Sequence, residues 1–135
     1  MGKKVVLLVL DLFADWEGAY ISTMLQDDNI SIISQVIWAS IDKKPKKSMG
    51  YMTMIPDITL EEIPDDIDAL ILIGGKSYRS NDADKLTFYV DKFIKAGKVV
   101  GFICDATYYA AKQGFLNSVK HTGNGLHEMI KLREY

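Results

Sequence analysis

The feature that most constrains the fold is the recurrence of short, continuously apolar segments. The segments Lys4–Leu10, Ala69–Ile73 and Val99–Cys104 carry almost no polar side chain after their first residue. An apolar run of this length is typical of a strand that is covered on both faces, as the central strands of parallel sheets are. The sequence therefore predicts an α/β fold with a mostly parallel sheet.

Other segments extend this pattern along the chain. Three further strands are expected at Ile30–Ser40, Met49–Ile55 and Val119–Thr122. Four segments are predicted to be helices: Trp16–Leu25, Asp82–Ala96, Ala106–Lys112 and Leu126–Arg133. Strands and helices that alternate in this way place helices on both faces of the sheet. Residues 1–135 contain no linker or repeat, and we expect them to form a single domain.

Charge and cysteine content limit the classes of partner and the compartment. The net charge is −2, so no overall positive field favours nucleic acid or an anionic membrane surface, and we expect neither as a partner. The basic cluster at residues 43–47 is interpreted as a solvated loop. One cysteine cannot form an intramolecular disulfide, and no apolar stretch is long enough to span a membrane. We therefore expect a cytoplasmic protein.

The single cysteine lies where a predicted strand gives way to a predicted helix. Cys104 ends the apolar run, and the helical pattern starts directly after it. A side chain on such a turn points outward, and the dipole of the following helix favours the thiolate, which is the nucleophilic form. Cysteine also packs well as a small hydrophobe, so a purely structural role is the alternative.

Two other strand ends carry unusual residues. Gly74 and Gly75 follow a predicted strand, and paired glycines let the backbone approach another group closely. An amide from this turn and the amide of Asp105 could hold an oxyanion, although Gly-Gly is also an ordinary turn. Glu17 lies in the first turn of a predicted helix, where it either caps the helix or points toward the cysteine sulfur. In a parallel sheet, ligands bind beyond these carboxyl ends of the strands.

The order of these pieces resembles the ThiJ/PfpI family. The resemblance rests on Glu17 after the first strand, on "DALILIGG" at Asp68–Gly75 and on "AGKVVGFICDATYYAAKQGFLNSVKHTGN" at Ala96–Asn124. This family is the Parkinson-disease-protein and intracellular-protease group of the class I glutamine amidotransferase-like superfamily. The resemblance implies a flavodoxin-like three-layer sandwich, assembled as a homodimer, that acts on a small-molecule or peptide substrate.

The resemblance also implies roles for individual residues. It makes Cys104 the nucleophile, Glu17 its acidic partner, and Gly75 with Asp105 the source of the oxyanion-hole amides. The sequence departs from the family pattern in two ways. Asp105 stands where family members described as proteases carry histidine, and the chain ends before the family's usual closing strand and helix. The carboxylate beside the cysteine disfavours the thiolate, whereas the helix N-terminus favours it.

Three functions remain open from the sequence. The first is a cysteine hydrolase that uses Cys104 as nucleophile and acts as a peptidase or amidase or is amidotransferase-like. The others are a glyoxalase- or deglycase-like enzyme for reactive aldehydes and a redox-sensing stress protein. His121 is a possible catalytic base at the end of a predicted strand, and Gly74 a possible further oxyanion-hole donor. One cysteine and two histidines without close ligand spacing predict no metal site. We expect no cofactor, because no phosphate loop or dinucleotide fingerprint is present.

Overall fold

The structure is a computed structural model that describes residues 2–29 and 33–131. Its strands are β1 (Lys3–Leu8), β2 (Ile33–Ser40), β3 (Lys46–Lys47), β4 (Thr53–Met54), β5 (Ile58–Thr59), β6 (Ala69–Leu72) and β7 (Val99–Phe102). Its helices are α1 (Asp15–Leu25), the 3-10 helix η1 (Lys76–Arg79), α2 (Asn81–Asp84), α3 (Thr87–Lys95), α4 (Asp105–Lys112) and α5 (Leu126–Lys131).

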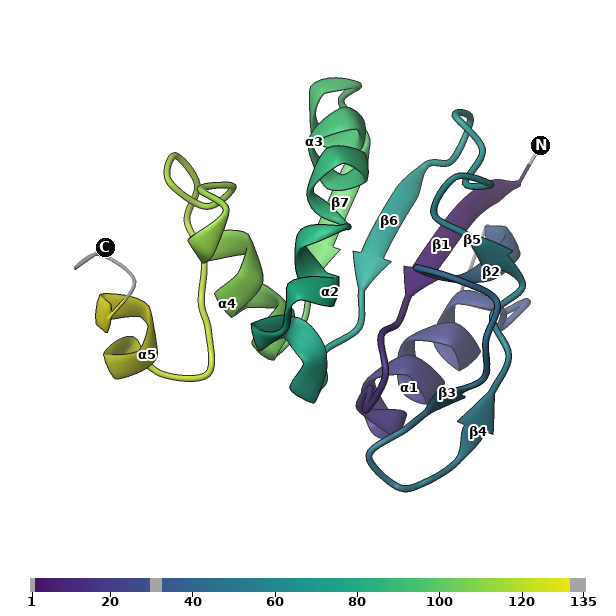
Figure 1. Cartoon of the computed structure of the whole chain (residues 1–135). Helices are drawn as coiled ribbons and strands as arrows, with labels where there is room; N and C mark the ends of the chain where they lie inside the picture. Colours follow the sequence, from purple (N-terminus) through teal and green to yellow (C-terminus); the bar gives the residue numbers. More distant parts are fainter. Residues whose placement is uncertain (1, 30–32, 132–135) are drawn as a thin grey trace.

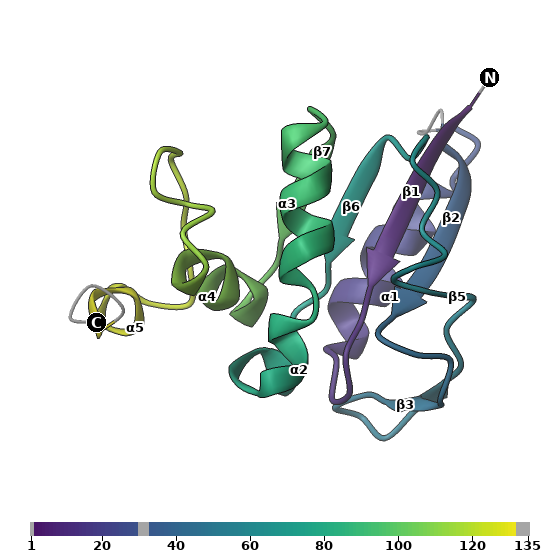
Figure 2. The same cartoon turned by 45° about the horizontal axis from the view of Figure 1, so that its top comes forward.

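Five strands form a parallel sheet in the order β5-β2-β1-β6-β7 (Figure 1). The chain leaves β1 toward β2 on one side and later returns to its other side at β6, so the strand order reverses between β1 and β6. Helix α1 covers one face of the sheet, and α2 and α3 lie over the other (Figures 1 and 2). The predicted α/β architecture with a mostly parallel sheet and helices on both faces is confirmed.

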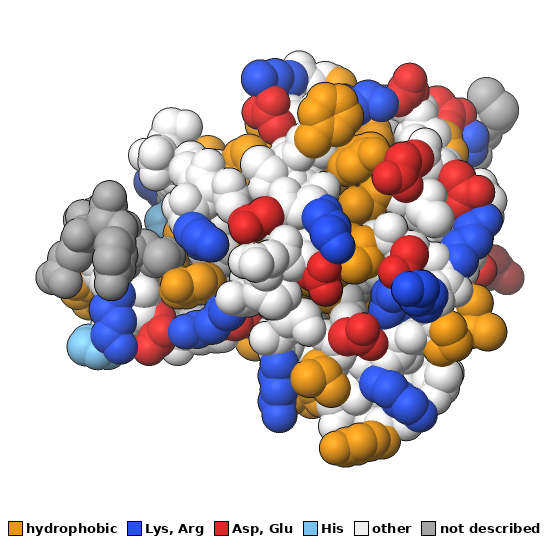
Figure 3. Space-filling view, viewed as in Figure 1, with side chains coloured by type: hydrophobic (Ala, Val, Ile, Leu, Met, Phe, Trp, Pro, Cys, Tyr) orange, Lys and Arg blue, Asp and Glu red, His pale blue; other side chains and the backbone are white. Residues whose placement is uncertain are grey.

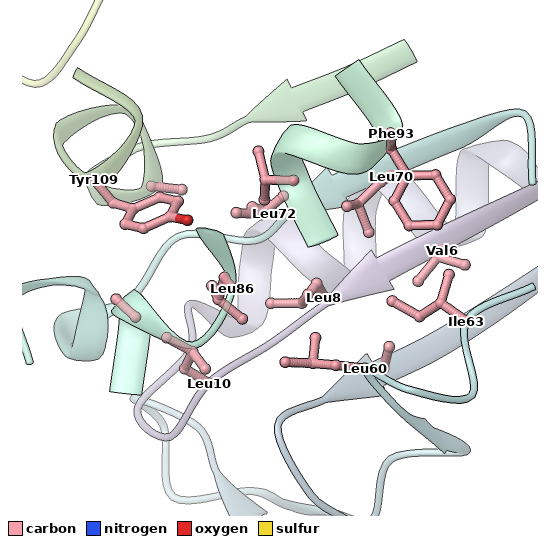
Figure 4. Packing of buried hydrophobic residues seen from close by; sticks show 14 of the residues in the cluster. Val6, Leu8, Leu10, Leu60, Ile63, Leu70, Leu72, Leu86, Phe93 and Tyr109 are labelled. Atoms are coloured by element: carbon pink, nitrogen blue, oxygen red, sulfur yellow. The ribbon is translucent and has the colours of Figure 1, made fainter. Parts of the chain in front are cut away.

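The alternation of side chains along β1 divides the core into two halves. Val6 and Leu8 belong to the larger cluster on the side of α3, which also contains Leu72, Phe93 and Tyr109 (Figure 4). The intervening residues of β1 face α1 and pack with Phe13 and Ile73. Every side chain from residue 5 to residue 10 is at most 3% exposed. This burial on both faces explains why the segment is apolar throughout.

Most of the predicted elements are confirmed. Within the described residues, four strands of the main sheet (β1, β2, β6 and β7) and the helices α1, α4 and α5 match the segments expected for them to within a residue or two at their ends. The first three residues of the expected strand Ile30–Ser40 and the last two of the expected helix Leu126–Arg133 lie outside the described residues. The edge strand β5 was not predicted, because two residues are too few to show a hydrophobic period.

The segment between β2 and β5 differs from its prediction. Only Thr53–Met54 of the expected strand Met49–Ile55 is extended, and it pairs antiparallel with β3 rather than joining the main sheet. The lysine cluster at residues 43–47 is not wholly solvated, because Lys46 is 3% exposed and paired with Asp42. This hairpin is held by backbone hydrogen bonds to the loop after β1, from Leu12 N to Lys47 O and from Met49 N to Phe13 O.

Two further predictions are wrong in part or entirely. The expected helix Asp82–Ala96 is broken at Lys85–Leu86, and this turn places the side chains of Ala83 and Leu86 together in the core. The expected strand Val119–Thr122 is irregular chain. It follows a series of turns after α4 that leads the chain away from the sheet, and Val119 is 53% exposed.

The surface carries charges of both signs. Acidic and basic side chains are interspersed over the face shown in Figure 3. Several of them form ion pairs across the body, such as Lys92 with Asp65 and Lys43 with Glu62. Among the described residues, no helix combines the length and the apolar character needed to cross a membrane.

Candidate functional site

The candidate site lies at the carboxyl ends of β1, β6 and β7. The segment after β1 leads into α1 and Glu17, the segment after β6 contains Gly74 and Gly75, and β7 leads into Cys104. Because the strand order reverses between β1 and β6, a crevice for ligands is expected at this end of the sheet.

Cys104 adopts a backbone conformation that is rare for a residue with a side chain. Its φ is 55° and its ψ is −123°, and it stands between the end of β7 and the first residue of α4. Such a conformation costs on the order of 1–3 kcal/mol and persists only where the surrounding structure imposes it. The side chain is partly buried, and the sulfur is a free thiol. The sharp turn between strand and helix expected at this residue is therefore present.

Gly74 brings Glu17 and Cys104 together. The Gly74 N–H donates a hydrogen bond of 2.7 Å to Oε2 of Glu17. A Cβ placed on Gly74 would lie 2.6 Å from that oxygen, 2.7 Å from Cβ of Cys104 and 2.8 Å from the carbonyl oxygen of Ile103. A side chain at this position would collide with both groups, so glycine is required here for close approach. Glu17 thus faces the cysteine corner rather than bulk solvent.

Two backbone amides beside this corner are unpaired. Among the hydrogen bonds of the described residues, the N–H groups of Gly75 and Asp105 donate to no acceptor, whereas that of Gly74 is used by Glu17. Gly75 is held against the loop after β1, where an added Cβ would lie 2.6 Å from the carbonyl oxygen of Leu12. The two N–H groups that the sequence suggested for an oxyanion hole are therefore available as donors.

Arg79 was not recognised from the sequence as part of the site. Its Nε and Nη2 donate to the two carboxylate oxygens of Asp105, each at 3.2 Å. Its Nη1 donates to Glu128 at 3.0 Å, and its guanidinium carbon lies 4.3 Å from the ring centroid of Tyr108. These carboxylates raise the pKa of Arg79, and the Arg79 guanidinium in turn lowers the pKa of Glu128. A lone arginine 26 residues before its partner gives no sequence signal.

Tyr78 contributes a buried hydroxyl on the inner side of η1. The residue is 2% exposed, and its hydroxyl is the one buried side-chain polar atom of the described residues without a hydrogen-bond partner. Burial, together with the nearby Tyr109 and Glu17, raises the pKa of Tyr78 well above its ordinary value. Neighbouring residues of η1 therefore face opposite ways, with Tyr78 toward the core and Arg79 toward α4.

The structure places His121 apart from these groups. His121 is exposed in the loop after α4 and lines a cavity of about 450 Å³ with Phe102, Phe115 and Val119. Neither Cys104 nor Glu17 is among the residues that line this cavity. Within the same ranges, no three His, Cys, Asp or Glu side chains are grouped so that they could hold a metal ion.

Comparisons with known proteins relate the whole chain to one family. The model of the DJ-1/PfpI family matches residues 3–134. The uncharacterized protease YdeA of Bacillus subtilis is 32% identical over 133 residues, which cover 98% of this chain and 65% of that protein. The uncharacterized protease YoaZ of the same organism is 31% identical, with 94% of this chain and 63% of that protein covered. The chain thus spans slightly less than two thirds of these relatives.

Solved structures share the fold. The DJ-1 superfamily protein Atu0886 from Agrobacterium tumefaciens matches with a TM-score of 0.84 and 31% identity, over 96% of this chain and 68% of that one. A thiJ/pfpI family protein from Bacillus anthracis matches with a TM-score of 0.86 and 29% identity, over 98% and 65% of the two chains. Both similarities extend over almost the whole of this chain.

Proposed function

The chain belongs to the DJ-1/PfpI family, and from this premise we propose that it is a cytoplasmic cysteine hydrolase that cleaves a peptide or another amide. One observation carries the proposal. Cys104 is held in a strained turn beside Glu17, with the unpaired amides of Gly75 and Asp105 next to it. Two relatives are named as uncharacterized proteases, which supports the same class of reaction.

Each group has a definite part in this reaction. The Cys104 thiolate adds to the carbonyl carbon of the amide, and the amides of Gly75 and Asp105 stabilise the negative charge that forms on the oxygen. Glu17 takes the proton of the thiol when the thiolate forms. When the C–N bond then breaks, Glu17 gives this proton to the leaving amine. Water cleaves the resulting thioester, which releases the carboxylic acid and restores the thiol.

A second candidate is an enzyme for reactive aldehydes. It is favoured by the position of Glu17, because the ionisable side chain held next to the Cys104 corner is a carboxylate and not a histidine. The thiol of Cys104 would add to the aldehyde carbon of a 2-oxoaldehyde to form a hemithioacetal. Glu17 would move a proton from that carbon to the neighbouring carbonyl carbon, which gives a 2-hydroxy thioester, and water would hydrolyse the thioester to the 2-hydroxy acid and the free thiol.

Intact-protein mass spectrometry tests these proposals. The protein and its Cys104→Ser variant are treated in parallel with a peptide chloromethyl ketone, methylglyoxal or peroxide. A hydrolase should be labelled by the ketone at Cys104 and should not turn over methylglyoxal. Turnover of methylglyoxal that is lost in Glu17→Gln supports the second candidate. Addition of two oxygen atoms to Cys104 as the sole response supports a redox sensor, and equal labelling of the protein and Cys104→Ser contradicts all three.

We further propose that the chain forms a homodimer through the outer face of α1. Trp16, Tyr20 and Met24 are 60%, 73% and 39% exposed and succeed one another at four-residue spacing. With Glu17 and Ile103 they line an apolar hollow of about 640 Å³ beside the site. Such an exposed apolar stripe is typical of an interaction surface. Light scattering should give twice the mass of one chain for the protein and that of a monomer for Tyr20→Lys; a monomeric parent contradicts the proposal.

A further inference from the structure

The guanidinium of Arg79 binds the carboxylate of Asp105, the residue next to the proposed nucleophile, through two hydrogen bonds, an arrangement called here the Arg79 fork. Asp105 follows Cys104 in the chain, and its side chain is only 15% exposed. Both of its carboxylate oxygens accept hydrogen bonds from Arg79, and Oδ1 also accepts one from Asn124 at 3.4 Å. A planar guanidinium that binds a carboxylate through two parallel hydrogen bonds fixes its orientation as well as pairing its charge.

Without this fork the carboxylate would be drawn toward the reaction centre. Asp105 is the first residue of α4, and a free carboxylate in the first turn of a helix is attracted to the unpaired N–H groups there. The N–H of Asp105 itself is one of these and is a proposed oxyanion donor. A carboxylate at that place would occupy the donor and would also disfavour a thiolate on Cys104.

We propose that Arg79 is a positioning residue that keeps the Asp105 carboxylate turned away from Cys104. Arg79 is itself fixed from two further directions, by Glu128 of α5 and by the ring of Tyr108. It therefore acts through Asp105 and not by touching the substrate. The inference rests on the reactive cysteine of the proposed function, but it does not depend on which substrate is cleaved.

Several ionisable groups face this corner, and each could contribute to its pH dependence. They come from α1, η1, α4 and α5: Glu17, Tyr78, Arg79, Asp105, Tyr108 and Glu128. Among them, Arg79 is the cation, and a second cation, Lys131 of α5, pairs with Glu128 at 3.6 Å. Removal of Arg79 has two separable effects, the loss of a positive charge and the release of the carboxylate. The loss of the positive charge acts whether or not residue 105 is charged, whereas release of the carboxylate requires the aspartate at position 105.

The test measures the rate of Cys104 alkylation by iodoacetamide as a function of pH. Because the chain has one cysteine, the profile reports this thiol alone. In Arg79→Gln we expect the midpoint of the profile to rise by about one pH unit, with a roughly tenfold slower reaction below it. Arg79→Lys keeps the charge but not the fork, and it should also raise the midpoint. When Asp105→Asn is already present, adding Arg79→Gln should shift the midpoint far less.

The controls distinguish the positioning role of Arg79 from an effect of its charge alone, and they distinguish failure of this inference from failure of the proposed function. Lys92→Gln removes a comparably exposed cation from an ion pair at the other end of the sheet and should leave the profile unchanged. Melting temperatures should stay close to that of the parent for every variant. If Arg79→Gln shifts the midpoint equally with and without Asp105→Asn, or if Arg79→Lys keeps the parental profile, the effect is one of charge alone and the inference is overturned. A parent whose Cys104 reacts only after unfolding contradicts the proposed function as well.

Discussion

The sheet with its covering helices and the C-terminal arm, residues 113–131, are built in different ways. In the sheet, β1, β6 and α3 bury their apolar side chains in two clusters. In the arm, Leu116 is buried but Val119, Leu126 and Ile130 are 53%, 76% and 45% exposed, and no residue of α5 is buried. Figures 1 and 2 show α5 standing apart from the sheet.

The two regions therefore have different roles: the sheet and its helices stabilise the fold, whereas the arm affects the order of the site. Burial of apolar surface stabilises the sheet. The strand ends that carry Cys104 and Gly74, and the helix α1 that carries Glu17, belong to that stable part. Helix α5 instead contacts the site through the ion pair between Glu128 and Arg79. We therefore expect substitutions in the sheet to change stability and substitutions in the arm to change local order.

The largest effect is expected from a matched pair of leucines. Leu72→Ala, at a position that is fully buried in β6 between β1 and β7, should lower the free energy of unfolding by about 2–5 kcal/mol. Leu126→Ala, at a 76% exposed position in the arm, should lower it by about 0.5 kcal/mol or less. Urea unfolding followed by circular dichroism measures both. Equal losses would show that the arm is part of the cooperative core.

A second pair of substitutions compares glycines. Gly74→Ala should destabilise the protein by about 1–3 kcal/mol, because the new methyl group overlaps Glu17 and Cys104. It should also slow the alkylation of Cys104. Gly125→Ala, in the arm, meets no atom within 4 Å and should leave stability and alkylation unchanged. Normal reactivity in Gly74→Ala would mean that the site is looser than its contacts indicate.

Alkaline pH should weaken the core through Tyr109. Burial raises the pKa of Tyr109 from 10.0 to about 12, so the unfolded chain loses this proton at a lower pH than the folded protein. The contribution of the protonated Tyr109 to the free energy of unfolding is fully present below pH 10. It is lost as the pH rises toward 12, at about 1.4 kcal/mol per pH unit. The pH dependence of stability should be flatter in Tyr109→Phe by that slope, which urea unfolding of the two proteins at a series of pH values measures. Equal slopes in the two proteins would contradict the prediction.

The smallest effect is expected from the contact that joins the arm to the site. Glu128→Gln should leave the free energy of unfolding almost unchanged, because an exposed ion pair stabilises little, yet it should expose the arm to limited proteolysis. Because Arg79 lowers the pKa of Glu128, the contact is present above the ordinary value of 4.5 and is lost as the pH falls through the lowered value. Asp91→Asn, which breaks the pair with Lys95 inside α3, is the control and should not alter cleavage of the arm.

Much of the fold and part of the site could be predicted from the sequence. A strand that is buried on both faces must be apolar at nearly every position, which made β1 recognisable. β6 and β7 were recognised by the same apolar runs, although only alternate residues of β6 are buried and no residue of the edge strand β7 is. The corner at Cys104 and the paired glycines followed from the same boundaries, since each comes directly after such a strand. Local patterns failed where they were short or broken, as in β5, the turn at Lys85–Leu86 and the segment Val119–Thr122.

The sequence by itself determined which segments are buried and which residues stand at the strand ends, because both depend on hydrophobic patterns within a few neighbouring residues. Only the tertiary structure decided which of those residues meet. Glu17 and Gly74 are 57 residues apart, and Arg79 and Asp105 are 26 apart. These pairs form because parallel strands bring the ends of distant segments to one edge of the sheet, and no local pattern in the chain records that approach.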